Sequence, residues 1–487
     1  MDGSGKKEST KVTFNLSKHD DFSEWYEQIV KKAELCDNRY PLKGMVAWMP
    51  YGYKALKLVM KKIECLLDET GHEEVSMPSL VPASIFQKEK DFLKGFSGEA
   101  YVITNVNEKP LEEKLYIRPT SETVMYEVVR QWINAVSDLP LKLYQTVNVF
   151  RYETKQTKPM LRVREIVKFN EAHTFHATEE SAEQQIKEAR QIYRKFFDFF
   201  MLPYIELRTP SWDTFPGAKY NYDFITVLPD GKGLELGSVI NLGDKFAKVY
   251  NLQYNENNEY KYVQQTCYGV SERTLGAIVA MHGDDNGLIF PSQIAPIQIV
   301  IVPILKKGDE DRIINKAEDI AAKLKGNGYR VLVDNSDKGA GDKFYYWEAK
   351  GIPARIEVGV READSSIITL FERATRHKIK VEESKLNEKI QEIYKSSDEE
   401  LKNRANVFFK KNMHNFSNAE EAVEYINKAD ILGLVSLPWC GEEKCGRALE
   451  ERLATPIIGY DDMHESKGIC AKCGKASKYN LYFGRTY

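Results

Sequence analysis

Residues 141–153 read Leu-Lys-Leu-Tyr-Gln-Thr-Val-Asn-Val-Phe-Arg-Tyr-Glu, an alternating, β-rich run that ends on a charged trio. The alternation predicts a strand over residues 141–150. Helical periodicity is found at residues 55–67 and again at 181–200, where the charged side chains share one face. Strands with intervening helices, but without a regular βαβ alternation, favour an α+β domain built around an antiparallel sheet.

A charged pair follows the predicted strand directly. Arg151 and Glu153 are two residues apart, so an extended chain would point both side chains to the same face. A guanidinium can hold a phosphate through two hydrogen bonds, and a carboxylate can hold a base or a magnesium ion. The loop behind the pair suits a polyanion because it carries Lys155, Lys158, Arg162 and Arg164. Taken alone, the pair also fits a surface hairpin with an Arg–Glu contact across its strands.

A polar triplet, Thr120-Ser121-Glu122, precedes this strand. A hydroxyl beside a carboxylate suits an ammonium or secondary ammonium group, because both oxygens accept hydrogen bonds. The alternative is an ordinary helix start, in which Pro119 and Thr120 end an extended piece and Glu122 lies in the first turn.

A third segment, Gln265-Thr-Cys-Tyr-Gly-Val-Ser-Glu-Arg273, leads into an apolar helix predicted at residues 274–282. Its glycine and the small residue after it would let a nucleotide approach the backbone. Arg273, at the helix start, is either a phosphate clamp or a solvated terminal charge.

Together the three segments resemble the class II aminoacyl-tRNA synthetases, and specifically the prolyl-tRNA synthetases of the archaeal and eukaryotic type. Residues 151–153 look like motif 2 of that family, and residues 269–273 look like motif 3. Residues 71–78 resemble motif 1, whose proline lies at the dimer interface, and residues 118–122 resemble the proline-pocket segment. Further matches continue through residues 229–232, 347–353, 355–359 and 482–487, so the resemblance covers nearly the whole chain.

The resemblance implies an enzyme that works in two steps. The carboxylate of L-proline would attack the α-phosphorus of ATP to give prolyl-adenylate, and the prolyl group would then pass to the terminal adenosine of tRNA(Pro). Positioning and charge neutralisation would carry most of the catalysis. The implied cofactors and partners are ATP as substrate, Mg²⁺, a structural Zn²⁺, and a second copy of the chain in a homodimer.

The resemblance also implies roles for individual residues. Arg151 would clamp the α-phosphate and Arg273 the γ-phosphate, and these two are the expected catalytic residues. The rest of the expected ATP site is Glu153 on adenine, Arg162 on the β- and γ-phosphates, and Glu235. Thr120 and Glu122 would accept the two N–H bonds of the proline ring nitrogen. The other expected proline-site residues are Phe169, Glu171, His173, Phe215 and Ser238, and Phe169 would stack on either proline or adenine.

One segment departs from the family's pattern. At residues 234–241 the family usually has a Gln, then Gly-Thr, then a His, whereas this chain has Glu235 and Ile240 in place of the Gln and the His. Glu235 adds a negative charge near ATP, and Ile240 removes a ring nitrogen. Asn241 is our hypothesis for a substitute donor.

The chain has 487 residues and a formal net charge of −3. This length predicts about three domains. The resemblance implies that they are a class II catalytic domain at 1–288, an α/β anticodon-binding domain at 289–395, and an α/β zinc-binding domain at 396–487. By resemblance, Glu348, Arg355 and Glu357 would read anticodon bases, since Glu suits the donors of guanine and Arg its acceptors. Only 92 residues separate His173 from Thr266; the sheet needs that length, which leaves no room for an inserted editing domain.

Four of the seven cysteines form two short pairs. Cys440-x4-Cys445 and Cys470-x2-Cys473 have the spacing of a tetrahedral zinc site, and Gly441, Gly446 and Gly474 would permit tight knuckle turns. Four thiolates would close the coordination shell, so we expect a structural site. The alternative is two unrelated buried pairs. Cys36, Cys65 and Cys267 are expected to be inert thiols.

No targeting or membrane segment is expected. No apolar run follows residues 1–7, and the most apolar stretch, 297–305, is far shorter than the roughly 20 residues of a membrane span. We therefore expect a cytoplasmic enzyme. A paralogue that binds tRNA, or that activates a proline-like amino acid without charging tRNA, is the competing hypothesis. A threonyl-type enzyme is disfavoured because we find no Cys/His/His set for a catalytic zinc in the amino-acid pocket.

Overall fold

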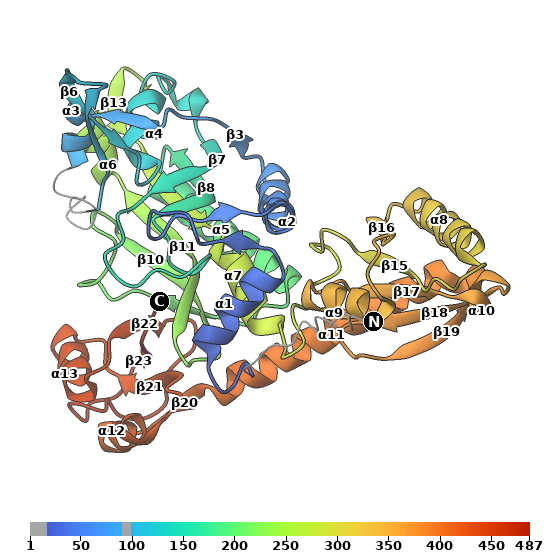
Figure 1. Ribbon diagram of the computed structural model, residues 1–487. Helices are drawn as coiled ribbons and strands as arrows, with labels where there is room; N and C mark the ends of the chain where they lie inside the picture. Colours follow the sequence, from blue (N-terminus) through green and yellow to red (C-terminus); the bar gives the residue numbers. More distant parts are fainter. Residues whose placement is uncertain (1–16, 90–98) are drawn as a thin grey trace. The chain divides into compact units, whose positions relative to one another are not determined.

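The computed structural model describes residues 17–89 and 99–487 (Figure 1). Residues 1–7, which bear on the expected absence of a targeting segment, lie outside this range. The chain forms two compact units. The first contains the described part of Met1–Asp37 together with Ala47–Leu58 and Ile278–Val407; the second contains Asn38–Val46, Val59–Ala277 and Phe408–Tyr487. Three helices contain residues of both units: α2 (Pro50–Asp68), α7 (Arg273–His282) and α11 (Leu386–Lys411).

The second unit is built on one eleven-stranded sheet. In spatial order its strands are β20 (Met413–Asn415), β21 (Leu434–Trp439), β23 (Tyr479–Phe483), β22 (Ile457–Asp461), β9 (Ile205–Arg208), β10 (Tyr220–Val227), β11 (Gly233–Gly243), β14 (Gln264–Val270), β8 (Glu165–His176), β7 (Leu141–Phe150) and β3 (Glu73–Glu74). From β21 to β7 every neighbouring pair is antiparallel. The α+β prediction and the strand at residues 141–150 are therefore confirmed. The strands of the C-terminal segment, β20 to β23, thus continue the sheet that the strands between residues 73 and 270 form.

Smaller elements complete this unit. A three-stranded sheet contains β4 (Leu80–Pro82), β6 (Lys109–Ile117) and β5 (Val102–Val106), and a hairpin contains β12 (Gln253–Glu256) and β13 (Glu259–Tyr262). The helices are α3 (Ala83–Phe86), α4 (Glu122–Val129), α5 (Glu179–Phe199), α6 (Lys245–Tyr250), α12 (Ala419–Lys428) and α13 (Glu443–Leu453), with the 3₁₀ turns η1 (Gln87–Glu89) and η3 (Val136–Asp138).

Helix α5 covers one face of the sheet. It begins where the Thr178 hydroxyl accepts a hydrogen bond from the Ser181 N–H, a standard helix cap. Its buried side chains recur at helical spacing, and Tyr193 contacts the rings of Phe224 and Tyr268 on the strands beneath. Neighbouring residues of a strand point to opposite faces, so Cys267 and Gly269 point to the other face, where the cavity described below lies.

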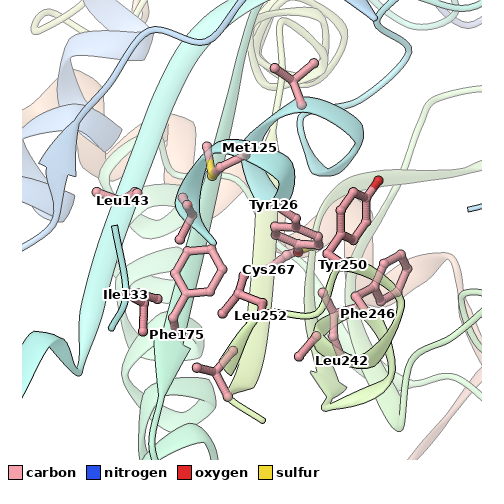
Figure 2. Close-up of a cluster of buried hydrophobic side chains, with 14 of the residues drawn as sticks. Met125, Tyr126, Ile133, Leu143, Phe175, Leu242, Phe246, Tyr250, Leu252 and Cys267 are labelled. Carbon is pink, nitrogen blue, oxygen red and sulfur yellow. The ribbon is translucent and has the colours of Figure 1, made fainter. Parts of the chain in front are cut away.

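An apolar cluster lies at one end of the sheet (Figure 2). The ring of Tyr126, on α4, makes edge contacts with Phe175 on β8 and with Phe246 and Tyr250 on α6. These rings are almost completely buried, and burying such a side chain contributes about 1.5–3 kcal/mol. The cluster holds α4 against the sheet and so fixes the residues at the start of that helix.

The first unit contains a mixed sheet in the order β16 (Val331–Val333), β15 (Ile299–Pro303), β17 (Ala354–Val358), β18 (Ile367–Glu372) and β19 (Lys378–Glu382). The pairs of β15 with β16 and β17 are parallel, and the other pairs are antiparallel. Its helices are α1 (Phe22–Lys32), α8 (Glu310–Gly326), α9 (Ala340–Ala349) and α10 (Val360–Ala363), with the turn η4 (Glu383–Lys385) and the short pair β1 (Cys36–Asp37) and β2 (Ala47–Trp48). The expected α/β domain is thus present.

Among residues 17–89 and 99–487, no helix combines the length and the apolarity that crossing a bilayer requires.

Candidate active site

A cavity of about 530 Å³ opens on the face of the large sheet opposite α5. It brings together residues that lie more than 150 positions apart in the sequence. Eleven of the twelve predicted proline- and ATP-site residues line it: Thr120, Glu122, Arg151, Glu153, Arg162, Phe169, Glu171, Phe215, Glu235, Ser238 and Arg273. The twelfth, His173, does not line it.

A pair of buried carboxylates forms one end of the cavity. The Thr120 hydroxyl lies 2.9 Å from Glu171 Oε1 and also contacts Glu122, while the Ser121 hydroxyl donates to Glu171. Glu122 and Glu171 are only 4% and 5% exposed. Two acidic groups held this close out of water favour a cationic ligand, because a cation compensates both for their mutual repulsion and for their lost hydration.

Residues 120–122 were expected to be either a helix start or a binding segment, and the structure is compatible with both. Glu122 is the first residue of α4, as an ordinary helix start would have it. Its side chain and that of Thr120 nevertheless line the cavity, so the helix start is also the binding segment.

The environment of Glu171 makes the affinity for a cation depend on pH. Burial, together with the nearby charge of Glu122, raises the pKa of Glu171 to about 7. Glu171 is therefore largely neutral below that pH and ionised above it, and the ionised form attracts an ammonium group more strongly. We expect the KM for a cationic substrate to fall as the pH rises from about 6 to about 8, by at most tenfold per unit below the pKa. Steady-state kinetics across this range check it; in Glu171→Gln the slope should flatten, and an unchanged slope in that variant would contradict the assignment.

Arg151 lies beside the carboxylates. It follows β7 in an irregular segment, so the expectation that residues 151–153 continue the strand is wrong, although both Arg151 and Glu153 still face the cavity. The Arg151 Nε donates to the Pro119 carbonyl at 3.0 Å, and its guanidinium carbon lies 5.4 Å from the centroid of the Phe169 ring. These contacts fix the guanidinium plane above the sheet, in an orientation suited to an anion.

Arg273 provides a second cation in the same cavity. It begins α7, and its Nε donates to the Leu161 carbonyl at 3.1 Å. The strand before it carries Gly269, where a Cβ atom would lie 3.2 Å from the Phe169 ring. The glycine therefore makes room for that aromatic ring, which lies against Arg151.

The loop after Arg151 supplies a third cation. Arg162 lies 3.7 Å from Glu153, and both line the cavity. Arg164 is instead turned onto the ring of Tyr152, with its guanidinium carbon 3.9 Å from the ring centroid, and its Nε donates to the Glu153 carbonyl. Arg162, which we predicted to bind ATP, is thus the one of these two arginines that faces the cavity.

A further acidic group, which sequence reasoning missed, lines the cavity at Asp223. Its oxygens accept hydrogen bonds from the side chains of Thr209, Asn221 and Ser238. Burial and the nearby charge of Glu235 raise the pKa of Asp223 to about 7. The period-two alternation of β10 was the available signal, because it places Asn221, Asp223 and Ile225 on one face.

The segment that departs from the family pattern is split between the two faces of β11. Glu235, Ser238 and Ile240 line the cavity, and the Ser238 hydroxyl contacts Glu235 Oε1 at 2.9 Å. The Asn241 amide points to the other face and donates to Glu183 on α5 at 2.9 Å. Our hypothesis that Asn241 substitutes for the missing ring nitrogen is therefore wrong, because consecutive strand residues face opposite sides.

His173 lies behind the cavity, on the same face of β8 as Glu171. It is 1% exposed, and a hydrogen bond of 3.0 Å joins its Nδ1 to the Tyr126 hydroxyl. Its Nε2 atom has no hydrogen-bond partner in the structure. One of its two ring nitrogens, a Glu122 oxygen and the Cys267 sulfur all lie within 4.8 Å of one another. Cys267, which we expected to be inert, therefore contacts the site.

The chain's last two residues also line the cavity. Thr486 pairs with Gly233, and the Tyr487 hydroxyl donates to Asp230 at 2.7 Å. The C-terminal segment thus contributes to this site as well as to the sheet.

The three residues predicted for the anticodon form a buried cluster in the first unit. Arg355, on β17, donates to Glu348 at 3.3 Å and to Glu357 at 3.1 Å. Its guanidinium carbon lies 4.0 Å and 4.2 Å from the ring centroids of Phe344 and Phe371. A second cavity of about 530 Å³, lined in part by Glu357 and Lys378, adjoins the cluster.

The four cysteines of the two short pairs converge. Their sulfur atoms all lie within 4.8 Å of one another, and the sulfurs of Cys440 and Cys473 are 3.8 Å apart. A tetrahedron with Zn–S bonds of about 2.3 Å has S···S edges of about 3.8 Å, so the set fits zinc. Although burial opposes it, donation from backbone N–H groups lowers the pKa of Cys470 to about 7.

Two of the three neighbouring glycines have the expected knuckle conformation. Gly441 and Gly474 have φ values of 90° and 72°. Gly446 lies instead within α13, where a Cβ atom would meet the Trp212 ring at 2.9 Å, so this glycine is needed for close packing.

Comparison with known proteins gives matches along most of the chain. Three family models match: the tRNA synthetase class II core domain (G, H, P, S and T) at residues 103–282, the anticodon binding domain at 298–393, and the prolyl-tRNA synthetase C-terminal domain at 419–487. The proline–tRNA ligase of Thermococcus kodakarensis is 44% identical over 96% of this chain and 98% of its own, and that of Methanopyrus kandleri is 42% identical over 96% of each. The structure of Giardia lamblia prolyl-tRNA synthetase in complex with prolyl-adenylate superposes with a TM-score of 0.92 at 34% identity, covering 98% of this chain and 100% of the Giardia chain.

Proposed function

Because this chain belongs to the prolyl-tRNA synthetases, which are ATP-dependent proline–tRNA ligases, we propose that its cavity holds the proline ring nitrogen between Thr120 and Glu122. The observation that carries this proposal is the buried carboxylate pair beside Arg151. The secondary ammonium has two donors, for which the Thr120 and Glu122 oxygens serve as acceptors. Arg151 then lies where the substrate carboxylate and the α-phosphate meet.

Three arginines divide the triphosphate among them. Arg151 neutralises the charge that develops on the α-phosphate, and Arg162 and Arg273 hold the outer phosphates. Placing cations where negative charge develops stabilises the transition state without reorganisation. Glu153 accepts from the adenine amine, and Phe169, which lies between Arg151 and Gly269, stacks on the adenylate or on the proline ring.

With the ring nitrogen between Thr120 and Glu122, other residues of the cavity form the walls of the proline site. Glu171 adds negative charge beside Glu122, Phe215 contributes an apolar surface, and Ser238 offers a hydroxyl. His173 does not line the cavity; it lies behind Glu122, is hydrogen-bonded to Tyr126, and helps to position Glu122.

Magnesium would have hard oxygen ligands in this cavity. Mg²⁺ prefers carboxylate and phosphate oxygens, and Glu153, Asp223 and Glu235 all line the space next to the arginines. When bound, the ion would neutralise phosphate charge. In this role Glu235 supplies a full carboxylate where the family usually has an amide.

A proline analogue with a ring oxygen tests the placement of the nitrogen. Tetrahydrofuran-2-carboxylate has nearly the shape of proline but no N–H donors, so it leaves two buried acceptors unpaired. Sites built around such hydrogen bonds reject the analogue by about 10⁴–10⁵. ATP–pyrophosphate exchange should be supported by proline and not measurably by the analogue; comparable kcat/KM values for the two would overturn the proposal.

We also propose that the four cysteines hold one structural Zn²⁺. Its binding would couple the turn at Cys440 to the turn at Cys470 and so stabilise the C-terminal strands. Cys470→Ser is expected to lose the zinc and to unfold at a lower temperature. Metal analysis and thermal denaturation, with Cys65→Ser as the matched control, measure both effects. Metal-free protein of unchanged stability would contradict the assignment.

For tRNA(Pro) we propose that Glu348, Arg355 and Glu357 contact anticodon bases. Arg355→Lys keeps the charge but loses the planar fork, and a bidentate base contact is worth about 1–3 kcal/mol. Charging of tRNA(Pro) should lose about 5- to 100-fold in kcat/KM, whereas proline-dependent exchange, which needs no tRNA, should keep its rate. An equal loss in both assays would argue for a purely structural role.

Three further expectations complete the proposal. The chain acts as a homodimer, which the resemblance of residues 71–78 to motif 1 supports. It works in the cytoplasm, where tRNA charging supplies translation. The chain has three domains with borders at residues 288 and 395, a division that the matched family segments at 103–282, 298–393 and 419–487 support.

A further inference from the structure

We propose that Glu122, His173 and Cys267 form a second metal site, at the floor of the proline pocket, which binds a zinc-type divalent cation in competition with proline. The three side chains come from α4, β8 and β14. They offer one oxygen, one nitrogen and one sulfur, and the three atoms lie within 4.8 Å of one another. The inference rests on the proposed function only in placing the ring nitrogen of proline at Glu122.

The spacing already approaches that of a zinc complex. Cys267 Sγ is 3.6 Å from Glu122 Oε1. With Zn–S near 2.3 Å and Zn–O near 2.1 Å, a tetrahedral S···O edge is about 3.6 Å. Closing the set around an ion therefore requires only small side-chain movements, chiefly of His173.

His173 has an unused ligand atom. The residue is 1% exposed, its Nδ1 is joined to the Tyr126 hydroxyl, and its Nε2 is buried without a partner. A buried polar atom without a partner costs about 1–3 kcal/mol. Coordination by Nε2 would remove that cost, with Nδ1–H donating to Tyr126 as an orienting partner of the kind that metal-bound histidines have.

The ligand set selects the type of ion. Thiolate and imidazole favour zinc and related transition ions over Mg²⁺, which prefers oxygen. The Cys267 proton is released to solvent when the sulfur binds, and the thiolate with Glu122 then balances the two charges of the ion. Glu122 and Cys267 line the cavity, so a water or another small ligand can occupy the fourth position, as in open zinc sites.

Proline and the ion exclude each other because both require Glu122. The ammonium of proline would donate a hydrogen bond to that carboxylate, whereas the ion would take the same oxygen as a ligand. Zinc-type ions should therefore inhibit proline activation competitively with proline. This effect is independent of the four-cysteine site, whose ligands are all different residues.

Cobalt binding tests the site on the intact chain. Protein carrying its one zinc at the four cysteines is titrated with Co²⁺, and a further equivalent should bind with a thiolate-to-cobalt charge-transfer band. Cys267→Ala should not bind that further equivalent. Cys267→Ser should not bind it either, and because serine keeps the side-chain shape, this variant serves if the alanine variant folds poorly. Cys65→Ser should still bind the further equivalent. The proposal would be overturned if the wild type did not bind the extra equivalent of Co²⁺, or if both Cys267 variants still bound it.

Competition with proline gives the second measurement. The apparent affinity for Co²⁺ should fall by a factor of one plus the ratio of the proline concentration to the dissociation constant of proline, which is about elevenfold at ten times that constant. If calorimetry shows that proline binds but the cobalt band is unaffected, mutual exclusion is wrong. Proline-dependent exchange in chelator-treated protein that keeps its structural zinc reports separately on the proposed function.

Discussion

Replacing Arg151 with Ala is expected to lower the kcat of proline-dependent ATP–pyrophosphate exchange by about 10²–10³-fold. The guanidinium is held in the cavity by the Pro119 carbonyl. In the proposed function it faces the place where proline and the α-phosphate meet. The charge on that phosphate grows in the transition state, so loss of the cation should reduce kcat more than it raises the KM for proline. Exchange rates at saturating substrates measure the effect.

Arg151→Lys is the matched control for this prediction. It keeps the positive charge but loses the planar pair of donors, so it should fall between the wild type and the alanine variant. Thermal denaturation of both variants separates chemistry from unfolding. An alanine variant within about threefold of the wild-type kcat would show that Arg151 does not contact the reacting phosphate.

Glu122→Gln is expected to raise the KM for proline by about 10- to 100-fold. Hydrogen bonds between charged groups contribute about 1.5–3 kcal/mol, and the amide keeps the shape while losing the charge. The ring nitrogen is not a reacting atom, so its binding is lost equally from the ground state and the transition state, and kcat should change much less. Initial rates over a range of proline concentrations measure the KM.

Two comparisons make the Glu122 prediction specific. The KM for ATP should stay within about twofold of the wild type, since the proposed function places Glu122 at the proline and not at ATP. Thr120→Ser, which keeps the hydroxyl, should behave nearly as the wild type. An unchanged KM for proline in Glu122→Gln would place the ring nitrogen elsewhere.

Much of the fold follows from local patterns. The strand at residues 141–150 was predicted residue for residue because its sequence largely alternates and is rich in β-forming residues, although its pairing with β8 has an irregularity between Val147 and Val149. Helix α5 begins two residues before its predicted start, at a Thr cap. The pattern failed at residues 151–153, where the chain leaves the sheet and a period-two argument no longer applies.

The pairing of strands that lie far apart in the sequence was the main feature that could not be predicted. Nothing in residues 434–483 signals that their strands extend the sheet of the catalytic core, because strand pairing across 200 residues leaves no local pattern. For the same reason the lining of the cavity by Thr486 and Tyr487 became visible only in the structure.

The direction in which individual side chains point was the other feature that could not be predicted from the sequence. Motif resemblance located His173, but only the register of β8 shows that it lies behind the wall, on Tyr126. Asp223 carries no motif, and its role depends on the alternation of β10 together with its position beside Ser238. Cys267 appeared inert in sequence because its neighbours Glu122 and His173 are 145 and 94 residues away.

The most direct test of the account is a single-turnover experiment with proline, ATP and then tRNA(Pro). Enzyme mixed with the first two should form prolyl-adenylate, approaching one per active site, with release of pyrophosphate. Addition of tRNA(Pro) should convert the adenylate into prolyl-tRNA. Absence of the adenylate, or adenylate that persists after tRNA(Pro) is added, would contradict the account, and the second result would favour an enzyme that activates proline without charging tRNA.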